Sequence, residues 1–105
     1  MNIITLNVET YFADDYTLSK MTTEEYVRDP RFETHVVGMR LNSSAPISDT
    51  AWFTHAQFLE LAPRYDWANS ALLCHHAHFD GLILSHHYGI KPAYYLDTLS
   101  MARLL

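Results

Sequence analysis

The chain contains very little cysteine, with Cys74 as its single thiol among 105 residues. An internal disulfide is therefore excluded, and the composition fits a reducing cytosol. No apolar run approaches the roughly 18 residues that a membrane span needs, and the start lacks the basic and apolar segments of a signal peptide. We expect a soluble cytoplasmic protein with no membrane partner.

Basic residues are also scarce, since seven Lys and Arg stand against twelve Asp and Glu, for a net charge of −5. This balance counts against a simple cationic clamp on nucleic acid. It leaves room for a nuclease, because an acidic centre can bind metal first and phosphate through the metal. The apolar fraction of 49% is that of a globular chain, so we expect one small domain or a piece of a larger one.

The strands are expected from runs of β-branched and aromatic residues. Residues 1–10 form a largely apolar run of the kind that is buried on both faces of a sheet. Further strands are expected at 35–41, 51–53, 71–75 and 94–96, and residues 42–44 read as a turn.

The helices are expected from their capping signals. Two capping boxes, Thr22 to Glu25 and Thr54 to Gln57, predict a helix over 23–28 and a second one that Pro63 ends or kinks. A third helix is predicted over 79–88, closed by Gly89. A last helix over 99–105 is still apolar where the sequence stops, so we expect a domain truncated at its C-terminus.

The order of these elements predicts the fold class. Three strands in succession are followed by alternating helices and strands, which suggests an α/β protein with a mixed sheet and helices on its faces. An antiparallel meander followed by crossover connections is typical of the ribonuclease H-like fold.

Two polar side chains are expected to converge at the end of the first strand. Asn7 and Glu9 are two residues apart, so both point to the same face of the sheet. A pair of acids at this place would suit a hard cation such as Mg²⁺. In this chain one member of the pair is an amide, which carries no charge.

Four stretches together resemble one enzyme family. Residues 6–10 (LNVET) resemble the first motif of the DEDD, or DnaQ-like, 3′–5′ exonucleases, and 73–80 (LCHHAHFD) resemble the second. Residues 97–103 are similar to the strand-to-helix segment that follows in that family. Residues 16–32 resemble a stretch common in the exonuclease domains of bacteriophage family A DNA polymerases. The whole chain, 1–105, is thus expected to be a single partial exonuclease domain.

The resemblance implies a function and a set of site residues. It implies two-metal hydrolysis of the 3′-terminal phosphodiester of single-stranded DNA, as a proofreading activity, with a polymerase domain in the full-length protein and the host cytoplasm as its location. Two Mg²⁺ or Mn²⁺ ions would be held at Asn7, Glu9 and Asp80. The terminal nucleotide would contact side chains near the two motifs, namely Thr10, Tyr11, Phe12, His76 and Phe79.

The sequence departs from the family in three ways. Asn7 stands where the family has aspartate, which removes a negative charge beside the expected metals. His76 stands where the second motif has asparagine. The third motif, which would supply a fourth carboxylate and the residue that orients the attacking water, is absent, so the chain as given is expected to be inactive.

Other readings stay open. The chain could be a catalytically dead module that binds nucleic acid or protein, or a zinc-stabilised domain built on its histidines, although their spacing fits no standard zinc pattern. Asp80 and Asp97 also have an ordinary role as acids at helix N-termini, and Cys74 as an inert buried thiol. An exposed apolar end could lead to self-association.

Overall fold

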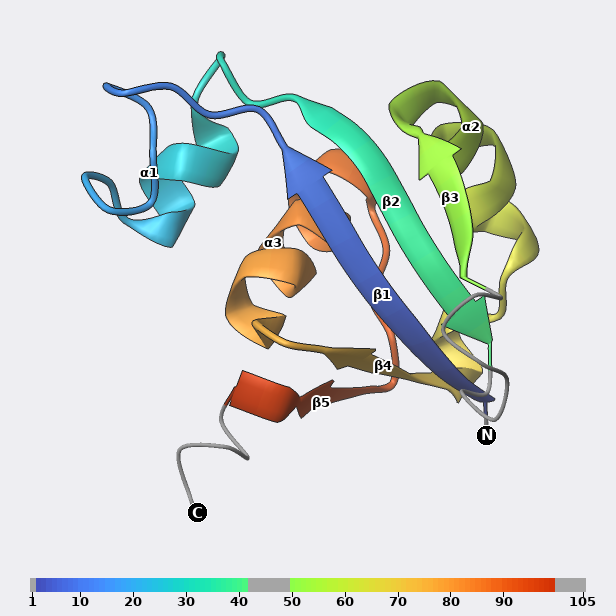
Figure 1. Ribbon diagram of the computed structural model, residues 1–105. Coiled ribbons are helices and arrows are strands. Elements are labelled where there is room, and N and C mark those ends of the chain that lie inside the picture. The colour runs from blue at the N-terminus through green and yellow to red at the C-terminus, as the bar shows by residue number, and fades with distance from the viewer. Residues whose placement is uncertain (1, 42–49, 100–105) are drawn as a thin grey trace.

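The computed structural model describes residues 2–41 and 50–99. They form an α/β fold around one five-stranded sheet with the strand order β3-β2-β1-β4-β5 (Figure 1). The strands are β1 (Asn2–Thr10), β2 (Thr34–Leu41), β3 (Ala51–Thr54), β4 (Ser70–Cys74) and β5 (Tyr94–Asp97). The expected mixed sheet is confirmed, and its arrangement is consistent with the ribonuclease H-like fold.

The sheet divides into an antiparallel half and a parallel half. Strand β1 pairs antiparallel with β2, which pairs antiparallel with β3. On its other side β1 pairs parallel with β4, and β4 pairs parallel with β5. The parallel pairs need crossover connections, and the helical segments between β3 and β5 provide them.

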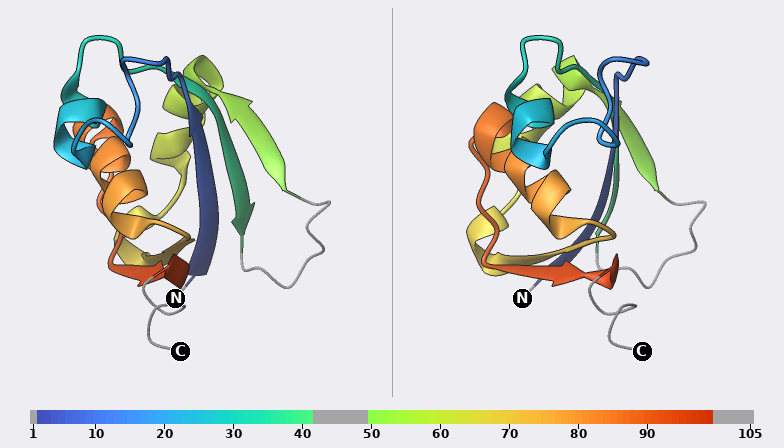
Figure 2. Two further views of the ribbon diagram at one scale, coloured as in Figure 1. Left: turned by 60° about the vertical axis from the view of Figure 1, so that its left-hand side comes forward. Right: turned by 90° about the vertical axis from the view of Figure 1, so that its left-hand side faces the viewer.

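The expectation that β1 is buried on both faces is wrong. Ile4, Leu6 and Val8 are at most 7% exposed, whereas Ile3 is 38% exposed and Asn7 and Glu9 are exposed. This alternation is that of a strand with one covered face and one open face. Figure 2 shows why, since the helices all lie on the same side of the sheet.

Local capping determines where the helices begin and end. Helices α1 (Thr23–Arg28) and α2 (His55–Leu61) both begin at the predicted capping boxes, with the reciprocal side-chain and backbone bonds present. Pro63 lies in a 3₁₀ turn directly after α2, where its missing N–H cannot continue the α-helical hydrogen bonds. Helix α3 (Ala77–Tyr88) begins two residues before the predicted start and ends at Gly89, whose φ of 67° is left-handed.

The core lies between the covered face of the sheet and the helices. Side chains without exposure include Val27 of α1, Phe58 of α2, Leu72 of β4 and Ile83 of α3. No helix within the described ranges is long and apolar enough to cross a membrane. The predicted turn at 42–44 and most of the predicted helix 99–105 lie outside the described residues.

Candidate functional site at the end of β1

The two polar residues at the end of β1 contact each other. The side-chain amide of Asn7 donates a hydrogen bond of 3.1 Å to the carboxylate of Glu9. Both side chains are exposed on the open face of the sheet, because they alternate with buried Leu6 and Val8. The expected convergence of Asn7 and Glu9 is confirmed, and the pair carries one negative charge rather than two.

The last residue of β1 is tied to helix α1 by a phenol. The Tyr26 hydroxyl donates to the backbone carbonyl of Tyr11 and lies 2.8 Å from the hydroxyl of Thr10. Since the phenol proton is used by the carbonyl, the Thr10 hydroxyl is the donor to Tyr26. The Tyr26 ring stacks on Tyr16 at 4.4 Å, and the Tyr16 hydroxyl donates to the Tyr26 carbonyl. These contacts fix the backbone just beyond Glu9.

Helix α3 brings two further predicted residues to this end of the sheet. Phe79 lies in its first turn, with its ring 5.8 Å from that of Tyr26. His76 is the N-cap residue of α3, and its ring is stacked 6.0 Å from Phe79. Phe12 is 74% exposed, so a large apolar surface faces solvent here.

A shallow pocket of about 250 Å³ joins several of these residues. It is lined by Val8, Glu9, Thr10, Phe12, Thr17, Leu18, Tyr26 and Phe79. Glu9, Thr10, Phe12 and Phe79 were all selected from the sequence. Asn7, Tyr11, His76 and Asp80, the other predicted residues, do not line it. The pocket offers two phenylalanine rings, hydroxyl groups and one carboxylate.

Asp80 does not lie with the polar residues at the end of β1. It is buried near Cys74 and Asp97. It is 6% exposed, in the first turn of α3. Burial raises its pKa to about 7, a hydrogen bond from Cys74 opposes the rise, and the negative charge of Asp97 adds to it. Burial and the two carboxylates raise the pKa of the Cys74 thiol to about 12, which fits the predicted inert thiol.

The sheet separates these acids from Asn7 and Glu9. Cys74 and Asp97 are register partners, and Cys74 lies two residues beyond Leu72, whose side chain is in the covered core. Alternation along the strand therefore places Cys74 and Asp97 on the covered face. Asp97 also accepts a hydrogen bond from the backbone N–H of Leu99, as expected for an acid that begins a helix.

The residues described do not fit a pair of divalent cations. Two such ions need several converging carboxylates, but Glu9 is paired with an amide donor and Asp80 is buried on the other side of the sheet. Within 2–41 and 50–99, no group of three or more His, Cys, Asp or Glu side chains could hold a metal ion. Binding of Mg²⁺ or Mn²⁺ stays a prediction from the sequence.

The histidines are distributed among separate contacts. His75 lies 2.9 Å from the Thr98 hydroxyl, and His78 lies 3.0 Å from Glu24. His87, in the last turn of α3, contacts the backbone carbonyl of Val27 at 2.7 Å. In the described part of the chain, the histidines therefore form no cluster of ligands for a zinc ion.

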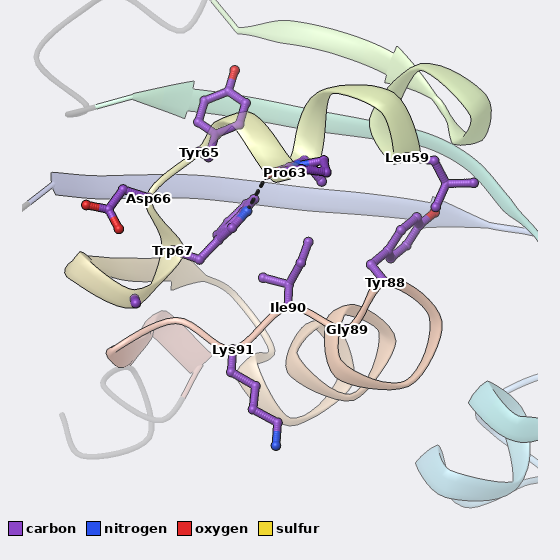
Figure 3. Close-up of a pocket in the computed structure, with 11 residues that line it drawn as sticks. Leu59, Pro63, Tyr65, Asp66, Trp67, Tyr88, Gly89, Ile90 and Lys91 are labelled. Carbon is purple, nitrogen blue, oxygen red and sulfur yellow. Dashed lines mark hydrogen bonds between the residues drawn. The ribbon is translucent and has the colours of Figure 1, made fainter.

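A larger cavity of about 550 Å³ lies between the segment that follows α2 and the end of α3 (Figure 3). Its walls include Leu59, Trp67, Tyr88 and Ile90. The Trp67 indole N–H donates to the carbonyl of Ala62 at 2.8 Å, so its polar group is already satisfied. None of the residues selected from the sequence lines this cavity.

Sequence reasoning missed the part that Tyr26 plays in the site. It is not among the site residues predicted above, yet it lines the pocket and its hydroxyl lies within hydrogen-bond distance of the Thr10 hydroxyl. The available signal was the stretch 16–32, which the sequence analysis singled out and which contains Tyr26 together with Thr17 and Leu18. Comparison of the chain with protein-family models, with curated proteins and with solved structures finds no match.

Proposed function

We propose that this chain binds the end of a single-stranded DNA through the pocket beside Glu9, without cleaving it. The observation that carries the proposal is the pocket itself, because four residues selected from the sequence for a nuclease-type site line it together. The exposed ring of Phe12 and the ring of Phe79 supply surfaces on which a base can stack. The resemblance to the DEDD exonucleases supports DNA as the ligand.

Binding without cleavage follows from the charges at the site. Asn7 donates to Glu9 where the family would have a second acid, and Asp80 is buried with a pKa of about 7. The wider setting, a proofreading exonuclease domain attached to a phage-type DNA polymerase, belongs to the same proposal and rests on the resemblance alone.

The affinity should be low and should depend on stacking. With a net charge of −5 the protein gains little from phosphate contacts, so we expect a dissociation constant on the order of 10⁻⁴ M for a short oligonucleotide. Fluorescence anisotropy with a labelled single-stranded DNA of a few nucleotides measures it. Replacing Phe12 with Ala should weaken binding by about fivefold or more.

The control removes another exposed apolar side chain, away from the pocket. Leu59, on α2, is 47% exposed and lies outside the pocket, so Leu59→Ala should leave the affinity unchanged. Equal affinity of the wild type and Phe12→Ala would contradict the proposal, as would an absence of binding by the wild type.

A further inference from the structure

Strand β5 is an open edge of the sheet. It pairs with β4, and no other described strand lies beyond it (Figure 1). An edge strand presents backbone N–H and C=O groups that can pair with another chain. Its first three residues carry large apolar side chains, with Tyr94 61%, Tyr95 44% and Leu96 39% exposed.

The opposite edge of the sheet exposes less apolar surface than β5. In β3 only Trp52, at 55%, is a large exposed apolar side chain, and Phe53 packs against the core. Edge strands are often protected by lysine, proline or a bulge. Strand β5 contains neither lysine nor proline, and its pairing with β4 has no register shift.

We infer that β5 pairs antiparallel with β5 of a second copy of this chain, which joins two sheets into one. The apolar sequence is self-complementary in one register, with Tyr95 at the two-fold axis. Tyr95 then faces Tyr95 of the second copy, and Tyr94 faces Leu96 of the second copy on either side. Aromatic and aliphatic cross-strand pairs of this kind stabilise antiparallel strands.

This register pairs side chains that lie on the same face of the sheet. Tyr94 and Leu96 are two residues apart and lie on the open face, whereas Tyr95 lies on the helix side, near Gly81 of α3. A two-fold axis perpendicular to the sheet keeps the open faces of both copies on one side, so each residue meets one from the same face. The two Asp97 carboxylates remain about 13 Å apart along the strands, beyond the screening length at physiological salt.

The small surface that β5 can bury limits the strength of the association between the two copies. Two half-exposed tyrosines and a leucine cover on the order of 300 Å² per copy, well below the ~800 Å² per partner of a stable interface. The dimer is therefore weak and appears as the concentration rises. Because each copy carries a net charge of −5, salt screens their repulsion and strengthens the dimer.

Sedimentation velocity over a concentration series, up to on the order of 100 μM, tests the inference. The wild type should show a growing dimer fraction, larger at high salt. Leu96→Lys should weaken dimerisation by about tenfold, because the new charge faces Tyr94 of the second copy twice per dimer. Leu59→Lys, an equally charged change at an exposed residue away from β5, should have no such effect.

A double variant tests the register and guards against misfolding. Tyr94→Glu combined with Leu96→Lys places opposite charges face to face in both pairs, so dimerisation should return relative to Leu96→Lys alone. A wild type that stays monomeric, a Leu96→Lys variant that behaves like Leu59→Lys, or a double variant that gains nothing would each overturn the pairing. All variants should keep the wild-type circular dichroism spectrum, since the changed side chains are exposed.

Discussion

The side-chain amide of Asn7 donates a 3.1 Å hydrogen bond to the carboxylate of Glu9, two residues along β1. Strand geometry alone brings the two groups together, and the bond requires that one of them be a donor. The amide therefore gives an attraction where two carboxylates would repel each other.

Asn7→Asp should reverse this relationship. Two carboxylates on one face, without the hydrogen bond, should lower the free energy of unfolding by about 0.5–1 kcal/mol in metal-free buffer. Urea denaturation measures the loss, and added Mg²⁺ should restore part of it if the two acids bind the ion together. Asn7→Ala is the control, because it removes the bond without adding charge and should not respond to Mg²⁺. Equal Mg²⁺ responses of the two variants would contradict a shared site.

The buried carboxyl of Asp80 should make stability depend on pH. Its folded pKa is about 7, against roughly 3.9 in an unfolded chain, so between these values the folded state holds a proton that the unfolded state has lost. The free energy of unfolding should therefore fall as the pH rises from about 4 to about 7, and then level off.

Asp80→Asn should remove this slope. Above pH 7 the variant should be more stable than the wild type by on the order of 2 kcal/mol, since a neutral amide replaces a buried charge. Denaturation curves at several pH values measure the difference. Asp66→Asn, at an exposed acid, should follow the wild-type profile. A flat wild-type profile would show that Asp80 ionises normally.

Much of the fold could be predicted, because its signals are local. The capping boxes at Thr22 and Thr54 involve residues three apart, and the left-handed Gly89 is a requirement of one residue. The burial of β1 was predicted wrongly because an apolar run does not reveal whether helices cover one face or both. Asn7 and Glu9, which alternate with apolar residues, were the available signal for an open face.

The candidate site was predicted only in part, for a similar reason. The convergence of Asn7 and Glu9 follows from strand geometry, whereas the orientation of Asp80 depends on packing against β4 and β5. The role of Tyr26 depends on a bond to the carbonyl of Tyr11, fifteen residues away, which no local pattern indicates.

Tyr26→Phe should test how strongly that phenol holds the end of β1. The variant keeps the ring and its stack on Tyr16 but leaves the carbonyl of Tyr11 without this donor. We expect a loss of about 1–2 kcal/mol in the free energy of unfolding and weaker binding of a short single-stranded DNA. Tyr65→Phe, outside the pocket, is the control for removing a tyrosine hydroxyl. Unchanged DNA affinity would show that the bond is structural only.

The thiol of Cys74 should react only when the protein unfolds. It is 3% exposed, and its pKa is raised to about 12, so almost no thiolate is present at neutral pH. Alkylation followed by mass spectrometry should be slow in buffer and fast in denaturant, with a rate that follows the unfolded fraction. Rapid labelling in buffer would mean that the contact between β4 and α3 opens readily.

The sheet order has a consequence for how the chain is made. Strands β1, β2 and β3 are neighbours in the sequence and in the sheet, so they can pair as soon as they leave the ribosome. The second partner of β1 is β4, which begins sixty residues after β1 ends. During that interval one side of the central strand has no native partner, and a chaperone or another nascent chain could reach it.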